Sequence, residues 1–278
     1  MRNICIFNLK GGVGKTTTAV NVASGLARNG NKVLILDMDA QGSINNCLSS
    51  NEAIKDMYHL IANGAELEEC ITHMGENLDA VTSKESLHDI DTELAKKANR
   101  DFILQNKLKN TRGYDFIIMD CPPHFSTMTK NALLFSDEVF IPVSVDVLGY
   151  KGLKKTMALI KEINDNTSEK VEVTKIIPTM YDKRLKIAKK ILSLLEDEYY
   201  GMVSNPIRHN SKLKEAPQKK MSIFRYARSS YGAKDYGLLV EEVLHSGKEN
   251  QEKSSFEISS AQDYIKEGKQ KTALQSRL

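Results

Sequence analysis

Residues 9–17 read Leu-Lys-Gly-Gly-Val-Gly-Lys-Thr-Thr and join a short apolar run, residues 4–7, to a segment with helical spacing. The run is rich in β-branched and aromatic residues, as buried strands are, and the apolar residues after Thr17 recur on one helical face. A glycine-rich loop between a strand and a helix suits phosphate binding, because its N–H groups and the helix N-terminus converge on an anion. The sequence therefore predicts a phosphate-binding loop.

Two lysines flank the glycines of this loop. The common phosphate loop has a glycine where Leu9 stands, and this loop carries a second cation, Lys10, in addition to Lys15. Cations held so close repel each other unless an anion offsets the repulsion. Lys15 is placed to reach the β- and γ-phosphates of a nucleotide, and the Thr16 hydroxyl to bind Mg²⁺.

Strand-like apolar segments alternate with helical patterns along most of the chain. The alternation predicts an α/β fold, a single P-loop domain with a mostly parallel, doubly wound sheet and helices on both faces. We place this domain at residues 1–245, with a polar, flexible tail at 246–278. Further strands are expected at residues 32–37, 78–82, 116–119, 138–143, 171–177 and 202–207, and helices at 149–163, 184–195 and through most of 51–112.

Aspartates stand where two of the expected strands end. Asp37 ends residues 32–37, with Asp39 two residues later, and Asp120 follows residues 116–119. Ligands of α/β sheets bind at the carboxyl ends of the strands. An aspartate at a strand end more often caps a helix, but behind a phosphate loop the metal role is favoured. We therefore expect Asp120 to hold the Mg²⁺ shell through water.

Composition narrows the class of protein. The chain has 278 residues, of which 41% are hydrophobic, so it can fill the core of one large domain. The four cysteines have no paired spacing, which argues for a reducing compartment and against a disulfide framework or a zinc site. The sequence shows no signal peptide or membrane span, so a cytoplasmic location is expected.

Residues 205–234 are strongly basic, although the net charge of the whole chain is only +3. Such runs are usually a solvated surface, but here the charges gather in one region with aromatic residues between them. Backbone phosphates of nucleic acid are the partner that this asymmetry favours, and no module for sequence-specific readout is visible. The residues expected to contact DNA are Arg208, Lys212, Lys219, Lys220, Arg225 and Arg228.

The motifs together resemble the ParA/Soj branch of the deviant Walker A ATPases, which partition chromosomes and plasmids. The resemblance extends in order from residue 2 to about residue 244. It is carried by residues 10–17, Asp37-Met-Asp-Ala-Gln-Gly42, Asp120-Cys-Pro-Pro123, Leu148-Gly149, Pro178-Thr-Met-Tyr-Asp182, Lys212-Leu-Lys-Glu-Ala-Pro217 and Ser230-Tyr-Gly-Ala-Lys-Asp-Tyr236.

The resemblance implies roles for single residues. Lys10 looks like the lysine that reaches the nucleotide of a partner subunit, and Asp39 like the aspartate that orients the attacking water. Asn210 and Pro217 fall where the family contacts adenine. By this likeness Lys10, Lys15 and Asp39 are catalytic, Thr16 and Asp120 serve Mg²⁺, and the phosphate cradle is Lys10, Gly11, Gly12, Val13, Gly14, Lys15, Thr16 and Thr17.

The expected function is a slow, Mg²⁺-dependent ATPase that acts as a molecular switch. ATP is favoured over GTP because no Asn/Thr-Lys-x-Asp segment is present to read guanine. The resemblance implies an ATP-bound homodimer on the nucleoid, non-specific binding of double-stranded DNA and a ParB-like or cargo-adaptor partner. The same switch could position another cargo, such as a carboxysome, a chemoreceptor array or a flagellar pole.

Two other readings of the same fold are weaker. A MinD-like spatial regulator needs an amphipathic membrane-binding tail, and Phe256, Ile258, Tyr264 and Ile265 do not form an apolar face for one. An electron-transfer reductase like the nitrogenase iron protein needs cysteines that share a cluster across a dimer, and Cys121 beside Asp120 is poorly suited to this.

Overall fold

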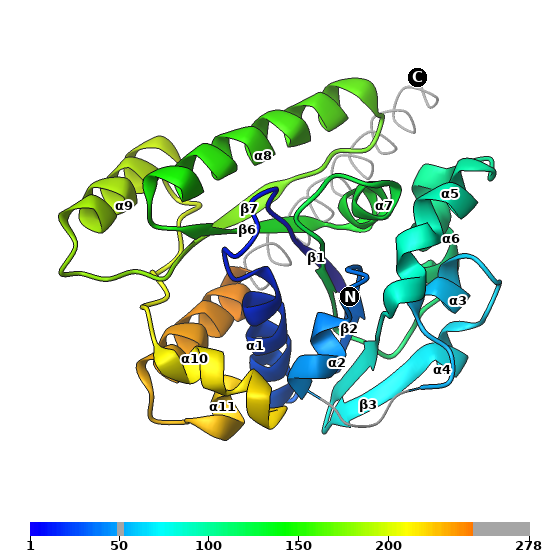
Figure 1. Cartoon of the computed structure of the whole chain (residues 1–278), viewed down its shortest axis with the longest axis horizontal. Coiled ribbons are helices and arrows are strands. Elements are labelled where there is room, and N and C mark those ends of the chain that lie inside the picture. Colours follow the sequence, from blue (N-terminus) through cyan, green and yellow to red (C-terminus); the bar gives the residue numbers. More distant parts are fainter. Residues whose placement is uncertain (49–52, 247–278) are drawn as a thin grey trace, which may run out of the picture. The chain divides into compact units, whose positions relative to one another are not determined.

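The computed structural model describes residues 1–48 and 53–246. Their centre is a seven-stranded sheet in the order β3-β4-β2-β5-β1-β6-β7 (Figure 1). Every neighbouring pair is parallel except β3 and β4, which are antiparallel. The expected mostly parallel α/β fold is confirmed. The strands are β1 (Arg2–Ile6), β2 (Val33–Asp37), β3 (Ile71–Gly75), β4 (Leu78–Val81), β5 (Phe116–Asp120), β6 (Glu138–Ser144) and β7 (Val173–Thr179).

Helices cover both faces of this sheet. Figure 1 shows α1 and α8 on opposite faces, and the central strands β2 and β5 are buried along their whole length. Burial on both faces explains why these strands are continuous apolar runs rather than alternating ones. The labelled helices are α1 (Lys15–Arg28), α2 (Ser43–Leu48), α3 (Met57–Ile61), α4 (Leu67–Cys70), α5 (Ile90–Ala95), α6 (Ile103–Leu108), α7 (Thr127–Phe135), α8 (Val147–Asn166), α9 (Lys186–Glu198), α10 (Ser211–Glu215) and α11 (Ile223–Tyr226), with 3-10 turns η1 (Glu85–Asp89), η2 (Arg100–Phe102) and η3 (Pro217–Lys219). Residues 231–239 are also helical.

Two expectations about strands were wrong. Residues 202–207 form one isolated bridge, Val203 with Ile176, and a second bridge, Arg208 with Tyr181, follows directly after them. Pro206 has no N–H to donate, which prevents a continuous ladder there. The second error is β3, an edge strand inside the region expected to be helical apart from residues 78–82; its short, partly exposed sequence lacks a clear period of two.

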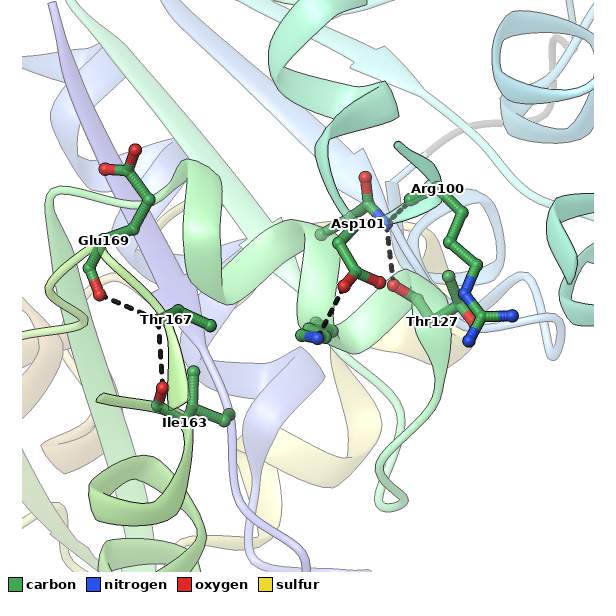
Figure 2. Close-up of polar contacts among 8 residues, drawn as sticks. Arg100, Asp101, Thr127, Ile163, Thr167 and Glu169 are labelled. Atoms are coloured by element: carbon green, nitrogen blue, oxygen red, sulfur yellow. Dashed lines mark hydrogen bonds and ion pairs between the residues drawn. The ribbon is translucent and has the colours of Figure 1, made fainter. Parts of the chain in front are cut away.

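Helix α7 follows the strand that ends in Asp120, and polar contacts fix it on η2. Lys130 forms an ion pair with Asp101 at 2.5 Å. The Asn131 amide donates to the carbonyls of Arg100 and Thr127 at 2.7 and 2.8 Å, and Figure 2 shows these two residues beside Asp101. The middle of α7 is thus fixed on η2.

The end of α8 is closed by Thr167. Its hydroxyl lies 2.9 and 3.0 Å from the carbonyl oxygens of Ile163 and Glu169, which share its one proton, as Figure 2 shows. A side-chain hydroxyl of this kind satisfies a carbonyl of the last helical turn that has no partner within the helix. The long helix beside β6 therefore has a defined end.

Contacts divide the chain into a unit of residues Met1–Leu239 and a second unit that begins at Val240. Of the second unit, residues 240–246 are described, and they are helical. The expected polar tail, residues 246–278, lies outside the described residues except for Ser246.

Candidate functional site: the carboxyl edge of the sheet

The glycine-rich loop leaves β1 and ends at the first residue of α1. Gly12 and Gly14 have φ angles of 74° and 92°, which L side chains rarely adopt, so glycine is required at both positions. Gly14 is the N-cap of α1. The first amides of a helix have no acceptor within the helix. Together with the N-terminal partial charge of α1, they make this end of the helix suitable for an anion.

Asn8 holds the beginning of the loop from inside the protein. It is fully buried, and its amide donates to the Pro142 carbonyl at 2.8 Å. Its side-chain oxygen accepts from the Lys10 amide at 2.9 Å and from the Thr156 hydroxyl at 3.1 Å. The same Thr156 oxygen accepts from the Leu9 amide at 3.1 Å. Sequence reasoning missed both Asn8 and Thr156, although a polar residue at the end of an apolar strand was a usable signal for Asn8.

The two lysines of the loop have different environments. Lys15 is 8% exposed, and its ammonium donates to the Lys10 carbonyl at 3.3 Å. Burial lowers the pKa of Lys15, and the charges of Asp120, Cys121 and Asp39 oppose that shift. Its ammonium is therefore held inside the loop, where an anion would favour the charged form.

Lys10 points away from its own loop. Its ammonium donates to the Ser144 hydroxyl at 3.3 Å, at the end of β6. Its stem lies against Gly152 of α8, where an added Cβ would come within 2.9 Å of the Lys10 Cβ. Glycine at position 152 therefore makes room for this lysine.

Asp37 and Asp120 are register partners at the ends of β2 and β5, and both are buried. Asp37 accepts hydrogen bonds from the amides of Asp39 and Ile44 at 3.1 and 2.9 Å. Burial, together with the charge of Asp120, raises the pKa of Asp37 above its ordinary value. Asp37 is therefore a structural anchor for the loop that carries Asp39.

Asp120 has no such partners. Neither of its carboxylate oxygens, although buried, has a hydrogen-bond partner in the described part of the chain. Burial raises the pKa of Asp120 to about 7, while the Thr16 hydroxyl and the Lys15 charge act against the shift. A buried carboxylate without a partner beside a hydroxyl suits a hard cation. Asp120 and Thr16 thus fit the magnesium position that the sequence predicts.

The magnesium would need further ligands from a nucleotide. Within residues 1–48 and 53–246, no group of three or more His, Cys, Asp or Glu side chains could hold a metal by itself. Mg²⁺ in phosphate-binding sites takes one or two protein ligands, with substrate phosphates and waters completing its shell. The residues present fit a nucleotide-bound Mg²⁺ rather than a self-contained metal site.

A small cavity lies beside the loop, and Asn210 is one of its lining residues together with Thr17, Arg208 and Tyr236. Asn210 also caps α10 by accepting from the Lys212 amide at 2.9 Å. Pro217 opens η3 and is not among the residues that line this cavity. The structure thus brings Asn210, but not Pro217, to the cavity that adjoins the phosphate loop.

The six basic residues expected to contact DNA fall into two groups. Arg208 forms an ion pair with Asp235 at 2.5 Å and stacks over the Tyr231 ring at 4.1 Å. Lys212 pairs with Glu215 at 2.7 Å. Among the described residues, the side chains of the second group form no ion pair and are exposed: Lys219, Lys220, Arg225 and Arg228.

Three of these exposed cations lie around one groove. Lys220, Arg225 and Arg228 line it from the segment around α11. Arg28, at the end of α1, lines the same groove and stacks on the Phe224 ring at 5.1 Å. Glu76 is an acid at this groove. Sequence reasoning missed Arg28, because it lies nearly 200 residues from α11 and only the fold brings the two together.

Among the described residues, none of the helices combines the length and the apolarity that crossing a membrane requires.

Comparison with known proteins places these features in one family. A family model described as an AAA domain matches residues 1–173. The chromosome-partitioning ATPase Soj of Treponema pallidum is 32% identical over 246 residues, which are 87% of this chain and 97% of Soj.

Solved structures of related proteins have the same fold. A putative plasmid partition protein of Borrelia burgdorferi bound to AMPPNP is 26% identical, with a TM-score of 0.77 over 88% of this chain and 99% of that one. The fold is shared with cobyrinic acid a,c-diamide synthase of Mycobacterium smegmatis with bound ATP analog and magnesium, at 23% identity, a TM-score of 0.77 and coverage of 89% and 96%. The chain belongs to the ParA/Soj family of partitioning ATPases.

Proposed function

We propose that this protein is a slow, Mg²⁺-dependent ATPase that serves as a switch for positioning DNA. ATP joins two copies, the joined form binds double-stranded DNA without sequence preference, and a ParB-like partner stimulates the hydrolysis that separates them. The observation that carries the proposal is the loop itself, in which Lys15 is buried against the loop backbone while the Lys10 ammonium lies at Ser144. The cargo would be a chromosome or a plasmid on the nucleoid.

The loop supports nucleotide binding by named groups. Gly11, Gly12, Val13 and Gly14 would offer backbone amides to the phosphates, and Lys15 its charge. Thr16 would bind Mg²⁺ directly and Asp120 would support it through water, while Thr17 would bind phosphate. When bound, the metal neutralises charge on the phosphates. We assign Asn210 to the adenine surroundings because it lines the cavity beside Thr17, and Pro217 by family likeness alone.

Lys10 is the residue that would link two copies. Because its ammonium lies on Ser144 rather than at its own phosphate loop, it is available to the nucleotide of a facing subunit. A cation supplied from a second subunit stabilises the charge that develops during phosphoryl transfer. Hydrolysis would then depend on dimerisation, and the nucleotide would control assembly.

The groove around α11 supports DNA binding. Lys220, Arg225 and Arg228 present charges there without ion-pair partners among the described residues, and Arg28 adds a fourth from α1. Four cations around one concave surface can neutralise neighbouring phosphates, which gives affinity without sequence specificity. Lys219 does not line the groove, but it is exposed and precedes Lys220 in the chain, so we assign it to the same surface. Arg208 and Lys212 would contribute less, because carboxylates already neutralise them.

The domain division is proposed along with the function. Residues 1–245 would carry the ATPase, and residues 246–278 would form a polar tail. The ATPase would then work in the cytoplasm. The alternative is that the same ATPase switch positions a cargo other than DNA. Isolating the partner protein that stimulates hydrolysis would distinguish a DNA cargo from another cargo.

The experiment that tests the proposal uses Asp39→Ala, because Asp39 is the residue assigned to orient the attacking water. We expect the variant to bind ATP and to stay a dimer, since hydrolysis no longer separates the subunits. Light scattering coupled to gel filtration measures the mass with ATP, with ADP and without nucleotide. Asp165→Ala, on the exposed surface of α8, is the matched control. A monomer of Asp39→Ala with ATP bound would refute the switch.

A further inference from the structure

Asp39 lies in a tight turn that its own groups close. The Gly42 amide donates to the Asp39 carbonyl at 3.1 Å. The Gln41 amide donates to the Asp39 carboxylate at 3.0 Å. Rotating the peptide that follows Asp39 would break the first of these bonds and move the turn. The position of the Asp39 carboxylate therefore depends on what holds the turn.

One side of the turn is held by Asp37 from the interior, through the amides of Asp39 and Ile44. The other side meets Ser83, just beyond the end of β4. The Ser83 hydroxyl donates to the Asp39 carbonyl, and Ser83 is 3% exposed. The Asp39 carbonyl thus accepts two hydrogen bonds, one from within its turn and one from a different strand connection.

Gly42 shows how closely the two segments pack. Its φ angle is 62°, and a Cβ added to it would lie 2.8 Å from the Ser83 carbonyl oxygen. The backbones of Gly42 and Ser83 are therefore in direct contact, so the Ser83 hydroxyl meets a turn that has little room to shift. Groups that are held in this way can fix a catalytic side chain to within a fraction of an ångström.

We infer that Ser83 is a positioning residue for Asp39. Its hydroxyl fixes the Asp39 carbonyl and, through the turn, the direction in which the Asp39 carboxylate leaves the backbone. Ser83 touches no nucleotide and takes no proton. The inference rests on the proposed role of Asp39, and it extends the site to a residue for which the motifs of the sequence give no signal.

The test compares Ser83→Ala with Ser83→Thr, which keeps the hydroxyl. We expect Ser83→Ala to lower ATP turnover roughly 10-fold, because a small misplacement of a catalytic group has effects of this size. The dissociation constant of a fluorescent ATP analogue should stay unchanged, and Ser83→Thr should restore turnover. Ser136→Ala is the matched control, since its buried hydroxyl also donates to a backbone carbonyl, that of Leu133, away from the nucleotide loop.

A second measurement needs no nucleotide. Hydrogen exchange of the peptide that covers residues 38–44 should be faster in Ser83→Ala than in the unaltered protein, and unchanged in Ser136→Ala. If Ser83→Ala does not fold, Ser83→Cys is used instead, because its thiol is a weaker donor of similar size. Unchanged exchange together with unchanged turnover would overturn the inference.

A double variant separates this inference from the proposed function. If Ser83 acts through Asp39, adding Ser83→Ala to Asp39→Ala should cause no further loss of turnover. If Ser83→Ala lowers turnover equally in the unaltered protein and in Asp39→Ala, Ser83 does not act through Asp39. That result would overturn the inference about Ser83 and leave the proposed function intact. If instead Asp39→Ala hydrolyses ATP at the normal rate, the role proposed for Asp39 fails, and with it the catalytic effect expected of Ser83.

Discussion

The nucleotide edge of the sheet and the basic groove beside α11 are built in different ways. At the edge, hydrogen bonds fix the loop through Asn8 to β6, and the turn of Asp39 to Asp37 and to Ser83. At the groove, the charges lie on exposed side chains of short helices and turns. The nucleotide edge is therefore determined by backbone geometry. The charge of the basic groove depends instead on which cations form ion pairs with carboxylates.

Among the changes that distinguish the nucleotide edge from the basic groove, Lys10→Ala is expected to have the largest effect on ATP turnover. Removing a cation that acts across subunits should reduce ATP turnover roughly 100-fold or more, as for charges supplied in trans in other phosphoryl transfers. Nucleotide affinity should persist, because Lys15 and the loop amides remain. Steady-state turnover and equilibrium binding measure the two quantities, with Lys155→Ala on α8 as the control. Unaltered turnover in Lys10→Ala would show that Lys10 has no catalytic role.

A smaller effect is expected from the groove. Changing Arg225 and Arg228 together to alanine should weaken DNA binding and lower the slope of log affinity against log salt by about 0.9 for each phosphate that the variant no longer neutralises. Lys212→Ala should have less effect, because Glu215 already neutralises that lysine. Filter binding across a salt series measures the slopes. The matched control is the double change of Lys155 and Lys161, two exposed lysines of α8. Equal slopes for both double variants would show that the groove does not bind DNA.

A third effect concerns stability without nucleotide or metal. Burial raises the pKa of Asp120 from 3.8 to about 7, so the folded protein keeps a proton that the unfolded chain loses. The free energy of unfolding should therefore fall as the pH rises from about 4 to about 7, by at most about 1.4 kcal/mol per pH unit from this group.

Asp120→Asn should remove that contribution. The variant should gain stability relative to the unaltered protein as the pH rises through this window, and the two should converge near pH 4. Urea unfolding in EDTA at several pH values measures the difference. A constant difference at every pH would mean that Asp120 titrates normally in the folded protein.

The parts of the fold that could be predicted from the sequence are those with a local cause. Gly12 and Gly14 are needed for positive φ angles, and the continuous apolar runs of β2 and β5 follow from burial on both faces. Asp120 could be placed at the sheet edge because it directly follows such a run. In each case a few neighbouring residues determine the geometry.

What could not be predicted depends on contacts between distant segments. Arg28 reaches the groove only because α1 packs beside α11, and Ser83 reaches the turn of Asp39 only because β4 pairs with β2. The pairing of Arg208 with Asp235 likewise lies outside the motif that contains the arginine. The apolar residues among 202–207 predicted a strand. The sequence pattern does not reveal that this segment forms isolated bridges instead of a continuous ladder.

The central claim is that the nucleotide edge controls the basic groove. Co-sedimentation with plain duplex DNA at low salt tests it most directly, with ATP, with ADP and without nucleotide, for the unaltered protein and for Lys10→Ala. The account predicts strong retention of the unaltered protein with ATP alone, and weak retention of Lys10→Ala in every condition. Equal retention of the unaltered protein with and without ATP would contradict it.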